Sequence, residues 1–154
     1  MILELLPERR IKTGIHAKDW KEVVEKSGQL MLEDRLIEST YVKAMCNSIV
    51  ENGPYVVIGE GVALLHARPE DGVNELGMSL VTLKEPVEFG NKDNDPVKVV
   101  FAFCATDNHQ HLKAMSELSE VLLQDDSVDT IYQFAEPAEI REYIRQILRN
   151  ASRR

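Results

Sequence analysis

At 154 residues, of which 44% are hydrophobic, the chain most economically forms one domain, residues 1–154, with a sizeable core. Its 18 Lys and Arg against 26 Asp and Glu give a net charge of -8, which argues against non-specific binding of nucleic acid. The apolar runs fall short of the roughly 18 residues that span a bilayer, and the N-terminus lacks a signal-peptide pattern, so we expect a soluble, cytoplasmic protein without membrane insertion.

The first half of the chain predicts two helices followed by two short strands. Apolar residues recur at helical spacing, and Gly-containing turns separate two runs that are rich in β-branched residues. The elements are helices over about 18–32 and 40–53, with Ser39 or Thr40 as N-cap of the second, and strands over 55–59 and 61–65. The first strand has Val, Val and Ile in succession, which is typical of a strand buried on both faces.

The second half predicts two further strands and three helices. The elements are a strand over 77–83, a turn or short hairpin at 87–90, a loop over 91–96, a strand over 97–105, a helix capped by residues 106–108, a short helix over about 127–134, and a helix from Pro137 to about Leu148. Residues 97–105 are the most hydrophobic and should form the central strand. Because helices and strands alternate without a linker, we predict an α/β sandwich with strands in the centre and helices outside.

His66 ends an apolar run of strand character and opens a polar loop, an arrangement by which a rigid scaffold presents a reactive side chain. The charge of an imidazole is tunable near neutral pH. His111 lies where the predicted central strand gives way to a helix. If both strand ends face the same edge of the sheet, the two imidazoles meet there. In the alternative interpretation, His109 only caps the helix and His111 only packs.

The motifs that the chain lacks exclude several classes of active-site chemistry. A zinc site would need three or four ligands at suitable spacing. Neither GxxxxGKS/T nor GxGxxG occurs to hold a nucleotide phosphate, and no GxSxG occurs to present a serine nucleophile. The first turn of the helix that contains His109 and His111 has unpaired N–H groups, which favour an anion. What remains is chemistry on a small anion with His66 as nucleophile.

Several segments, taken in order, resemble the enzyme IIA domain of the bacterial phosphoenolpyruvate-dependent sugar phosphotransferase system (PTS), mannitol/fructose class. Within that class the chain is most similar to the ascorbate and related pentitol-type components. The resemblance spans about residues 15–148. The segments that carry it are Tyr41–Met45, Gly53–Ile58, Gly61–Glu70, Gly77–Gly90, Ala105–Leu112 and Glu117–Leu118.

The resemblance implies a three-layer α/β sandwich in which helices flank a central mixed β-sheet. It implies that His66 is phosphorylated and that His111 stabilises the phosphoryl group, with no metal and no cofactor. Members of the family usually have Pro where this chain has Leu65. Mannitol-type members carry an Arg on the preceding helix, where this chain reads Cys46-Asn47-Ser48. Charge neutralisation then falls to Arg68.

The activity implied by the resemblance is that of a phosphotransferase. His66 would accept a phosphoryl group from the phosphocarrier protein HPr and pass it to a cysteine of a cognate IIB component, which serves the membrane component IIC. The carbohydrate is expected to be ascorbate or a pentitol-like sugar. The alternative is a regulatory IIA-type module whose phosphorylation state controls a transcription factor or a kinase, and both hypotheses retain His66.

Overall fold

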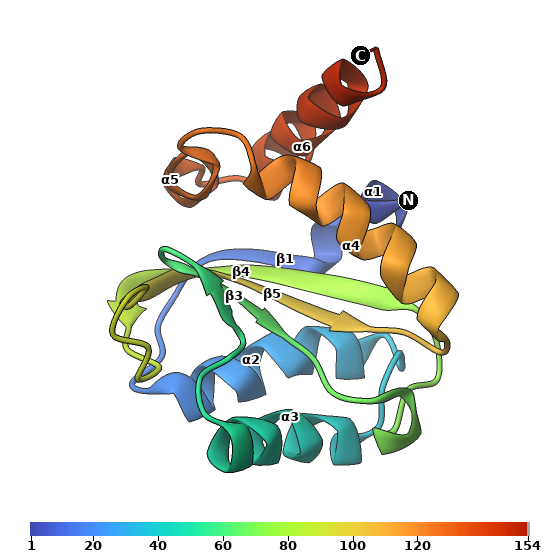
Figure 1. Cartoon of the computed structure of the whole chain (residues 1–154), viewed down its shortest axis with the longest axis vertical. Coiled ribbons are helices and arrows are strands. Elements are labelled where there is room, and N and C mark those ends of the chain that lie inside the picture. Colours follow the sequence, from blue (N-terminus) through green and yellow to red (C-terminus); the bar gives the residue numbers. More distant parts are fainter. Residues whose placement is uncertain (154) are drawn as a thin grey trace.

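A five-stranded mixed β-sheet forms the centre of the computed structural model, which describes residues 1–153 (Figure 1). The strands are β1 (Ile11–Ile15), β2 (Val57–Gly59), β3 (Val62–Leu65), β4 (Gly77–Val87) and β5 (Val97–Cys104). Their order in the sheet is β1-β4-β5-β3-β2, so β5 is central, as predicted. β5 runs parallel to β3 and antiparallel to β4, while β1 is parallel to β4 and β2 is antiparallel to β3.

Helices cover both faces of this sheet. They are α1 (Ile2–Leu5), α2 (Trp20–Glu33), α3 (Ser39–Asn52), α4 (Asn108–Leu122), α5 (Ser127–Gln133) and α6 (Pro137–Ala151), with short 3-10 helices η1 (Glu8–Arg10) and η2 (Pro69–Asp71). α2 and α3 lie on one face, and α1, α4, α5 and α6 lie on the other (Figure 1). The predicted three-layer α/β sandwich is confirmed. Within residues 1–153, no helix combines the length and the apolar character that crossing a bilayer requires.

The central strand β5 is buried on both faces, which explains its nearly continuous apolar sequence. Ala102 and Cys104 pack in the core beneath α2 and α3, whereas Phe101 and Phe103 pack in the core beneath α4 and α6. This alternation follows from the two-residue period of a strand. It places the ring of Phe103 under the start of α4.

The strand predicted over residues 55–59 is wrong in extent and in burial. β2 begins only at Val57 and forms an edge of the sheet, paired to β3 on one side. Val57 is buried, but the next side chain, Ile58, is 46% exposed because successive side chains of a strand point to opposite faces. Three successive β-branched residues therefore do not make this strand an interior one.

The N-terminal segment was not predicted, and it supplies α1, η1 and the second edge strand β1. Arg10, which is 5% exposed, fixes this segment in place. Its guanidinium donates to the carbonyl oxygens of Met78 and Leu5, each at 2.9 Å, and forms an ion pair with Asp34 of the α2–α3 connection. The partners of Arg10 are either far away in the sequence or backbone atoms. The residues next to Arg10 therefore contain no pattern from which the structure of this segment could be predicted.

Two further boundaries differ from the predicted ones. β4 continues past residue 83 to Val87 before the loop that leads to β5. α3 begins at Ser39 with Glu38 at its N-cap, so the predicted cap at Ser39 or Thr40 is wrong. The Thr40 hydroxyl instead donates to the carbonyl oxygen of Asp71 at 2.9 Å. The start of α3 is thereby tied to the loop that follows β3.

Candidate functional site

The two histidines singled out in the sequence come together at one edge of the sheet. β3 and β5 run parallel, with Leu65 paired to Ala102, so their carboxyl ends share that edge. His66 follows β3 directly, and His111 lies near the start of α4, the helix after β5. Burial lowers the pKa of the His111 imidazole, and the nearby His66 lowers it further. The condition under which the two imidazoles could meet, that both strand ends face the same edge, holds in the structure.

One ring nitrogen of His66 is hydrogen-bonded to the backbone, which determines the tautomer of its neutral ring. Its Nδ1 lies 3.0 Å from the carbonyl oxygen of Leu64. A carbonyl oxygen only accepts hydrogen bonds, so Nδ1 carries the proton of the neutral ring and donates it to Leu64. Nε2 then holds the free lone pair. Since the ring is half-buried, the backbone orients an imidazole that remains open to solvent on one side.

Tyr55, from the segment before β2, stands beside the His66 ring. The two ring centroids are 5.7 Å apart and the ring planes are perpendicular. The Tyr55 hydroxyl lies 2.6 Å from the Oγ atom of Ser48 on α3. Asn52, one turn further along α3, donates to the same Ser48 oxygen at 3.5 Å. The sequence offered no signal for this polar cluster, because residues 55–59 were interpreted as a buried strand.

His111 lies near the start of α4 and packs against the end of the central strand β5. Its ring meets the ring of Phe103 at a centroid distance of 5.4 Å and an interplanar angle of 62°. Asp107 caps the helix as predicted, with its carboxylate accepting from the Gln110 N–H at 2.9 Å. The lowered pKa favours the neutral form of His111, whose ring has one N–H to donate.

The hydroxyl of Tyr41 on α3 joins the loops that carry the two histidines. It accepts from the backbone N–H of Ala67, next to His66, at 2.9 Å and donates to the carbonyl oxygen of Phe103 at 2.8 Å. The side chain is 1% exposed, and this burial raises its pKa. The sequence places Tyr41 in a helix and in a segment that carries the family resemblance, without a role at the site. Its link to the site depends on contacts across the sheet edge that the sequence does not reveal.

The other candidate residues lie outside this cluster. Arg68 is exposed on the loop after His66, and its Nε atom is 3.6 Å from both the Glu70 and the Asp71 carboxylates. His109 is exposed on the first turn of α4. The structure therefore brings His66 and His111 together and leaves Arg68 among acidic neighbours in the same loop.

Apolar side chains accompany the histidines at the surface. Leu112, next to His111, is 69% exposed, and Tyr55 beside His66 is 45% exposed. Large apolar side chains that remain exposed beside polar ones are typical of surfaces that contact a partner. The site therefore has the character of a docking face rather than an enclosed pocket.

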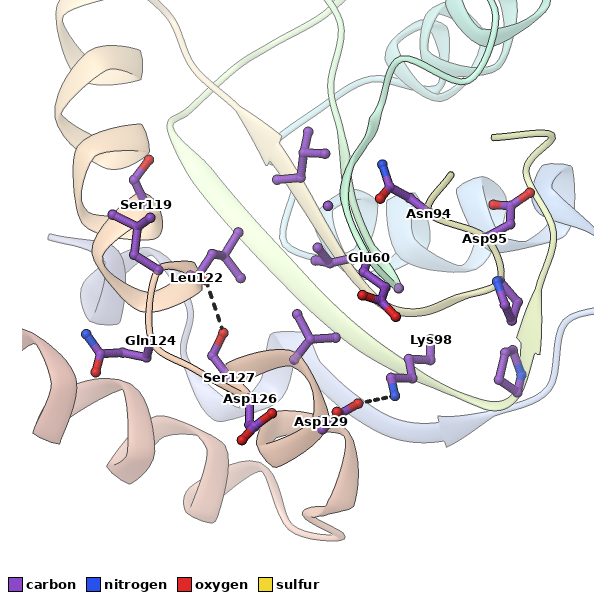
Figure 2. Close-up of a pocket in the computed structure, with 18 residues that line it drawn as sticks. Glu60, Asn94, Asp95, Lys98, Ser119, Leu122, Gln124, Asp126, Ser127 and Asp129 are labelled. Atoms are coloured by element: carbon purple, nitrogen blue, oxygen red, sulfur yellow. Dashed lines mark hydrogen bonds and ion pairs between the residues drawn. The ribbon is translucent and has the colours of Figure 1, made fainter. Parts of the chain in front are cut away.

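A cavity of about 820 Å³ lies at the other end of β3, around the β2–β3 turn and the α4–α5 connection. Figure 2 shows Lys98 of β5 reaching toward Asp129 of α5, with Glu60 on the β2–β3 turn nearby. The Ser127 hydroxyl donates to the carbonyl oxygen of Leu122 at 3.4 Å. No histidine lines this cavity, and nowhere in residues 1–153 do three His, Cys, Asp or Glu side chains gather to hold a metal ion.

Comparison with known proteins yields one family over nearly the whole chain. The family model described as "Phosphoenolpyruvate-dependent sugar phosphotransferase system, EIIA 2" matches residues 4–147. The mannitol-specific cryptic phosphotransferase enzyme IIA component of Escherichia coli K12 is 33% identical over 141 residues, 92% of this chain and 95% of the relative. The ascorbate-specific PTS system EIIA component of the same strain is 38% identical over 107 residues, 70% of each chain.

Solved structures share the fold. A putative PTS IIA (PtxA) from Streptococcus mutans superimposes with a TM-score of 0.85 at 33% identity, covering 91% of this chain and 89% of that one. The IIA chain in a complex of enzyme IIAMTL and phosphorylated enzyme IIBMTL from Escherichia coli has a TM-score of 0.80 at 22% identity, covering 92% and 99%. The predicted fold is thus found in proteins described as IIA components.

Proposed function

The chain belongs to the EIIA 2 family of the phosphoenolpyruvate-dependent sugar phosphotransferase system, and from that premise we propose that Nε2 of His66 carries the phosphoryl group. As a IIA component the chain takes part in sugar phosphotransfer and acts as a phosphotransferase. The observation that supports His66 as the carrier is the hydrogen bond of its Nδ1 to the Leu64 carbonyl, because this bond leaves Nε2 as the free nucleophile.

In the proposed reaction, Nε2 of His66 attacks phosphorus in line with the P–N bond of a donor phosphohistidine. The new P–N bond forms as the old bond breaks, and the electron pair of the old bond returns to the donor imidazole. Nδ1 of His66 keeps its proton throughout, since the Leu64 carbonyl holds it. In the second step an acceptor thiolate takes the phosphoryl group, and the electron pair returns to Nε2.

Negative charge on the transferring group is stabilised from the start of α4 and from the loop after β3. Transfer of this kind passes through a loose transition state, in which catalysis is mostly positioning and electrostatics. Neutral His111 donates its one ring N–H, and backbone N–H groups of the first turn of α4 other than that of Gln110, which Asp107 accepts, donate beside it. Arg68, two residues after His66, adds positive charge that Glu70 and Asp71 partly offset.

The proposed donor is phospho-HPr and the proposed acceptor is the cysteine of a cognate IIB component. The solved complex of enzyme IIAMTL with phosphorylated enzyme IIBMTL supports a IIB partner, because its IIA chain has the same fold. The exposed side chains of Leu112 and Tyr55 suit a face that must bind two proteins in turn. Exchange between partners requires short-lived complexes.

The chain acts in this scheme as a single IIA domain in the cytoplasm, and the IIB component delivers phosphate to a membrane component IIC. Ascorbate or a pentitol-like sugar is the proposed carbohydrate. The 38% identity with the ascorbate-specific component supports this choice, and the mannitol-specific cryptic relative keeps a polyol within the proposal. Specificity for the sugar itself resides in the downstream components.

Incubation with phosphoenolpyruvate, enzyme I and HPr tests the proposal. We expect acid-labile phosphate on the wild type and none on His66→Ala, with His16→Ala, which lies directly after β1, as the matched control that labels fully. Equal labelling of wild type and His66→Ala would overturn the assignment.

A further inference from the structure

We propose that the Tyr55 hydroxyl donates a hydrogen bond to the phosphoryl group on His66, and that Ser48 orients this hydroxyl for the purpose. This inference rests on the proposed function of His66 and assigns a phosphoryl-binding role to two side chains of α3 and the segment that follows it. Both residues precede β2 in the chain, and the fold brings them next to the loop that begins with His66.

The position of Tyr55 suits such a role. Its ring is perpendicular to the His66 imidazole at a centroid distance of 5.7 Å, and it remains 45% exposed. The Nδ1 side of the imidazole faces the backbone at Leu64, so a phosphoryl group on Nε2 projects away from the backbone. The exposed Tyr55 ring next to the His66 imidazole brings a hydroxyl-bearing side chain to the surface that a phosphoryl group on His66 would occupy.

The hydrogen bonds around Ser48 determine whether the Tyr55 hydroxyl proton is available to a phosphoryl group. Asn52 donates to the Ser48 oxygen at 3.5 Å, and the Ser48 and Tyr55 oxygens are 2.6 Å apart. When Ser48 donates to Tyr55, the Ser48 hydroxyl both accepts and donates, and the Tyr55 proton is left to point outward. The reverse polarity would direct two donors at the Ser48 oxygen and leave the Ser48 proton unused.

The hydrogen bond proposed here is charge-assisted and strengthens as negative charge moves onto the equatorial oxygens. Hydrogen bonds to ionised acceptors are about twice as strong as those between neutral groups. The two preceding donors, Asn52 and Ser48, polarise the Tyr55 hydroxyl in the same direction. Tyr55 forms and breaks no covalent bond, and its proton stays on the phenolic oxygen.

Three variants separate this role from a packing role. Tyr55→Phe keeps the ring and removes the hydroxyl, Ser48→Ala removes the orienting group, and Tyr132→Phe on α5 is the matched control because its hydroxyl contacts the carbonyl of Lys84 instead. We expect Tyr55→Phe to accept phosphate from phospho-HPr about tenfold more slowly and Ser48→Ala about threefold more slowly. The double variant should be no slower than Tyr55→Phe, because Ser48 acts through Tyr55.

A chemical donor makes the inference testable apart from the protein donor. Phosphoramidate transfers its phosphoryl group to an imidazole as its P–N bond breaks and ammonia leaves with the electron pair. On proteins phosphorylated this way, the 31P resonance of phosphohistidine should shift in Tyr55→Phe and Ser48→Ala relative to wild type, while Tyr132→Phe matches wild type. An identical resonance and transfer rate in Tyr55→Phe and Tyr132→Phe would overturn the role of Tyr55. Failure of phospho-HPr to label the wild type would instead count against the proposed function and leave the 31P comparison decisive for Tyr55.

Discussion

The hydroxyl of Tyr41 donates to the carbonyl oxygen of Phe103 at 2.8 Å, and this bond connects helix α3 to the carboxyl end of the central strand. The Tyr41 hydroxyl oxygen also accepts from the N–H of Ala67, and the ring of Phe103 contacts the imidazole of His111. One buried side chain therefore holds the backbones that position both histidines. Their separation is set by the core rather than by the exposed loops.

Removing this hydroxyl should cost stability. Tyr41→Phe leaves the Ala67 N–H and the Phe103 carbonyl without their partner inside the protein, so we expect the free energy of unfolding to fall by about 1–3 kcal/mol. Urea denaturation at pH 7 measures the change. Tyr132→Phe, whose hydroxyl makes one long contact at the surface, should stay within about 0.5 kcal/mol of wild type. Equal stability of the two variants would show that the Tyr41 bridge is not important.

His111 should affect the rate of phosphorylation but not the presence of the acceptor. His111→Ala removes one donor to the transferring group, so transfer from phospho-HPr should slow by about 100-fold while His66 is still labelled in full at long times. His109→Ala is the matched control, since that imidazole is exposed on the same turn of the helix. Complete loss of labelling in a folded His111→Ala protein would mean that the roles of His66 and His111 are reversed.

The depressed pKa of His111 predicts a specific dependence of stability on pH. Burial and the nearby His66 hold this pKa below the ordinary value of 6.5, so the unfolded chain takes up a proton at His111 more readily than the folded protein does. The free energy of unfolding therefore falls as the pH drops from about 6.5 through the folded pKa, and it is unaffected above 6.5.

Comparison of wild type with His111→Gln isolates this contribution. As the pH falls from 8 to 5, the wild type should lose stability through His111 and the variant should not, because glutamine does not titrate. The free energy of unfolding of the variant relative to wild type should therefore rise on acidification. Denaturant midpoints at several pH values measure it, with His109→Gln as control for a histidine at the exposed surface. A wild type that gains stability relative to His111→Gln on acidification would contradict the direction of the shift.

The N-terminal segment should depend on Arg10. Arg10→Met removes the buried donor to two backbone carbonyl oxygens, those of Met78 and Leu5, and one partner of the half-buried Asp34, which we expect to lower the free energy of unfolding by about 3 kcal/mol. Arg9→Met, whose exposed side chain pairs with the same carboxylate, should cost less than about 1 kcal/mol. Phosphorylation of the folded fraction should be unchanged in both variants. Equal effects of the two substitutions would refute the structural role assigned to Arg10.

The sequence was sufficient to locate His66 and His111 because each follows an apolar run that reads as a strand, and parallel strands bring their carboxyl ends together. It was also sufficient for the central position of β5, whose side chains are apolar on both faces. The sequence did not predict a role at the site for Tyr41, Tyr55 or Ser48. The hydrogen-bond partners of their hydroxyls lie on other elements, so no local sequence pattern indicates these contacts.

The edges of the sheet show where sequence reasoning fails. β1 is a short strand that contains Lys12 and Gly14, and its pairing with β4 joins residues far apart in the chain. β2 has the composition of an interior strand but borders solvent, as the exposed Ile58 demonstrates. An edge strand is one that has a neighbouring strand on one side alone. The sequence of the strand itself carries little information about how many neighbours it has.

The central claim is that phosphate resides on Nε2 of His66, and NMR of the phosphorylated, 15N-histidine-labelled protein tests it most directly. We predict one phosphohistidine whose 31P–15N coupling is to Nε2, with Nδ1 still protonated and bonded to the Leu64 carbonyl. Coupling to Nδ1, or a phosphohistidine signal that persists in His66→Ala, would contradict the account.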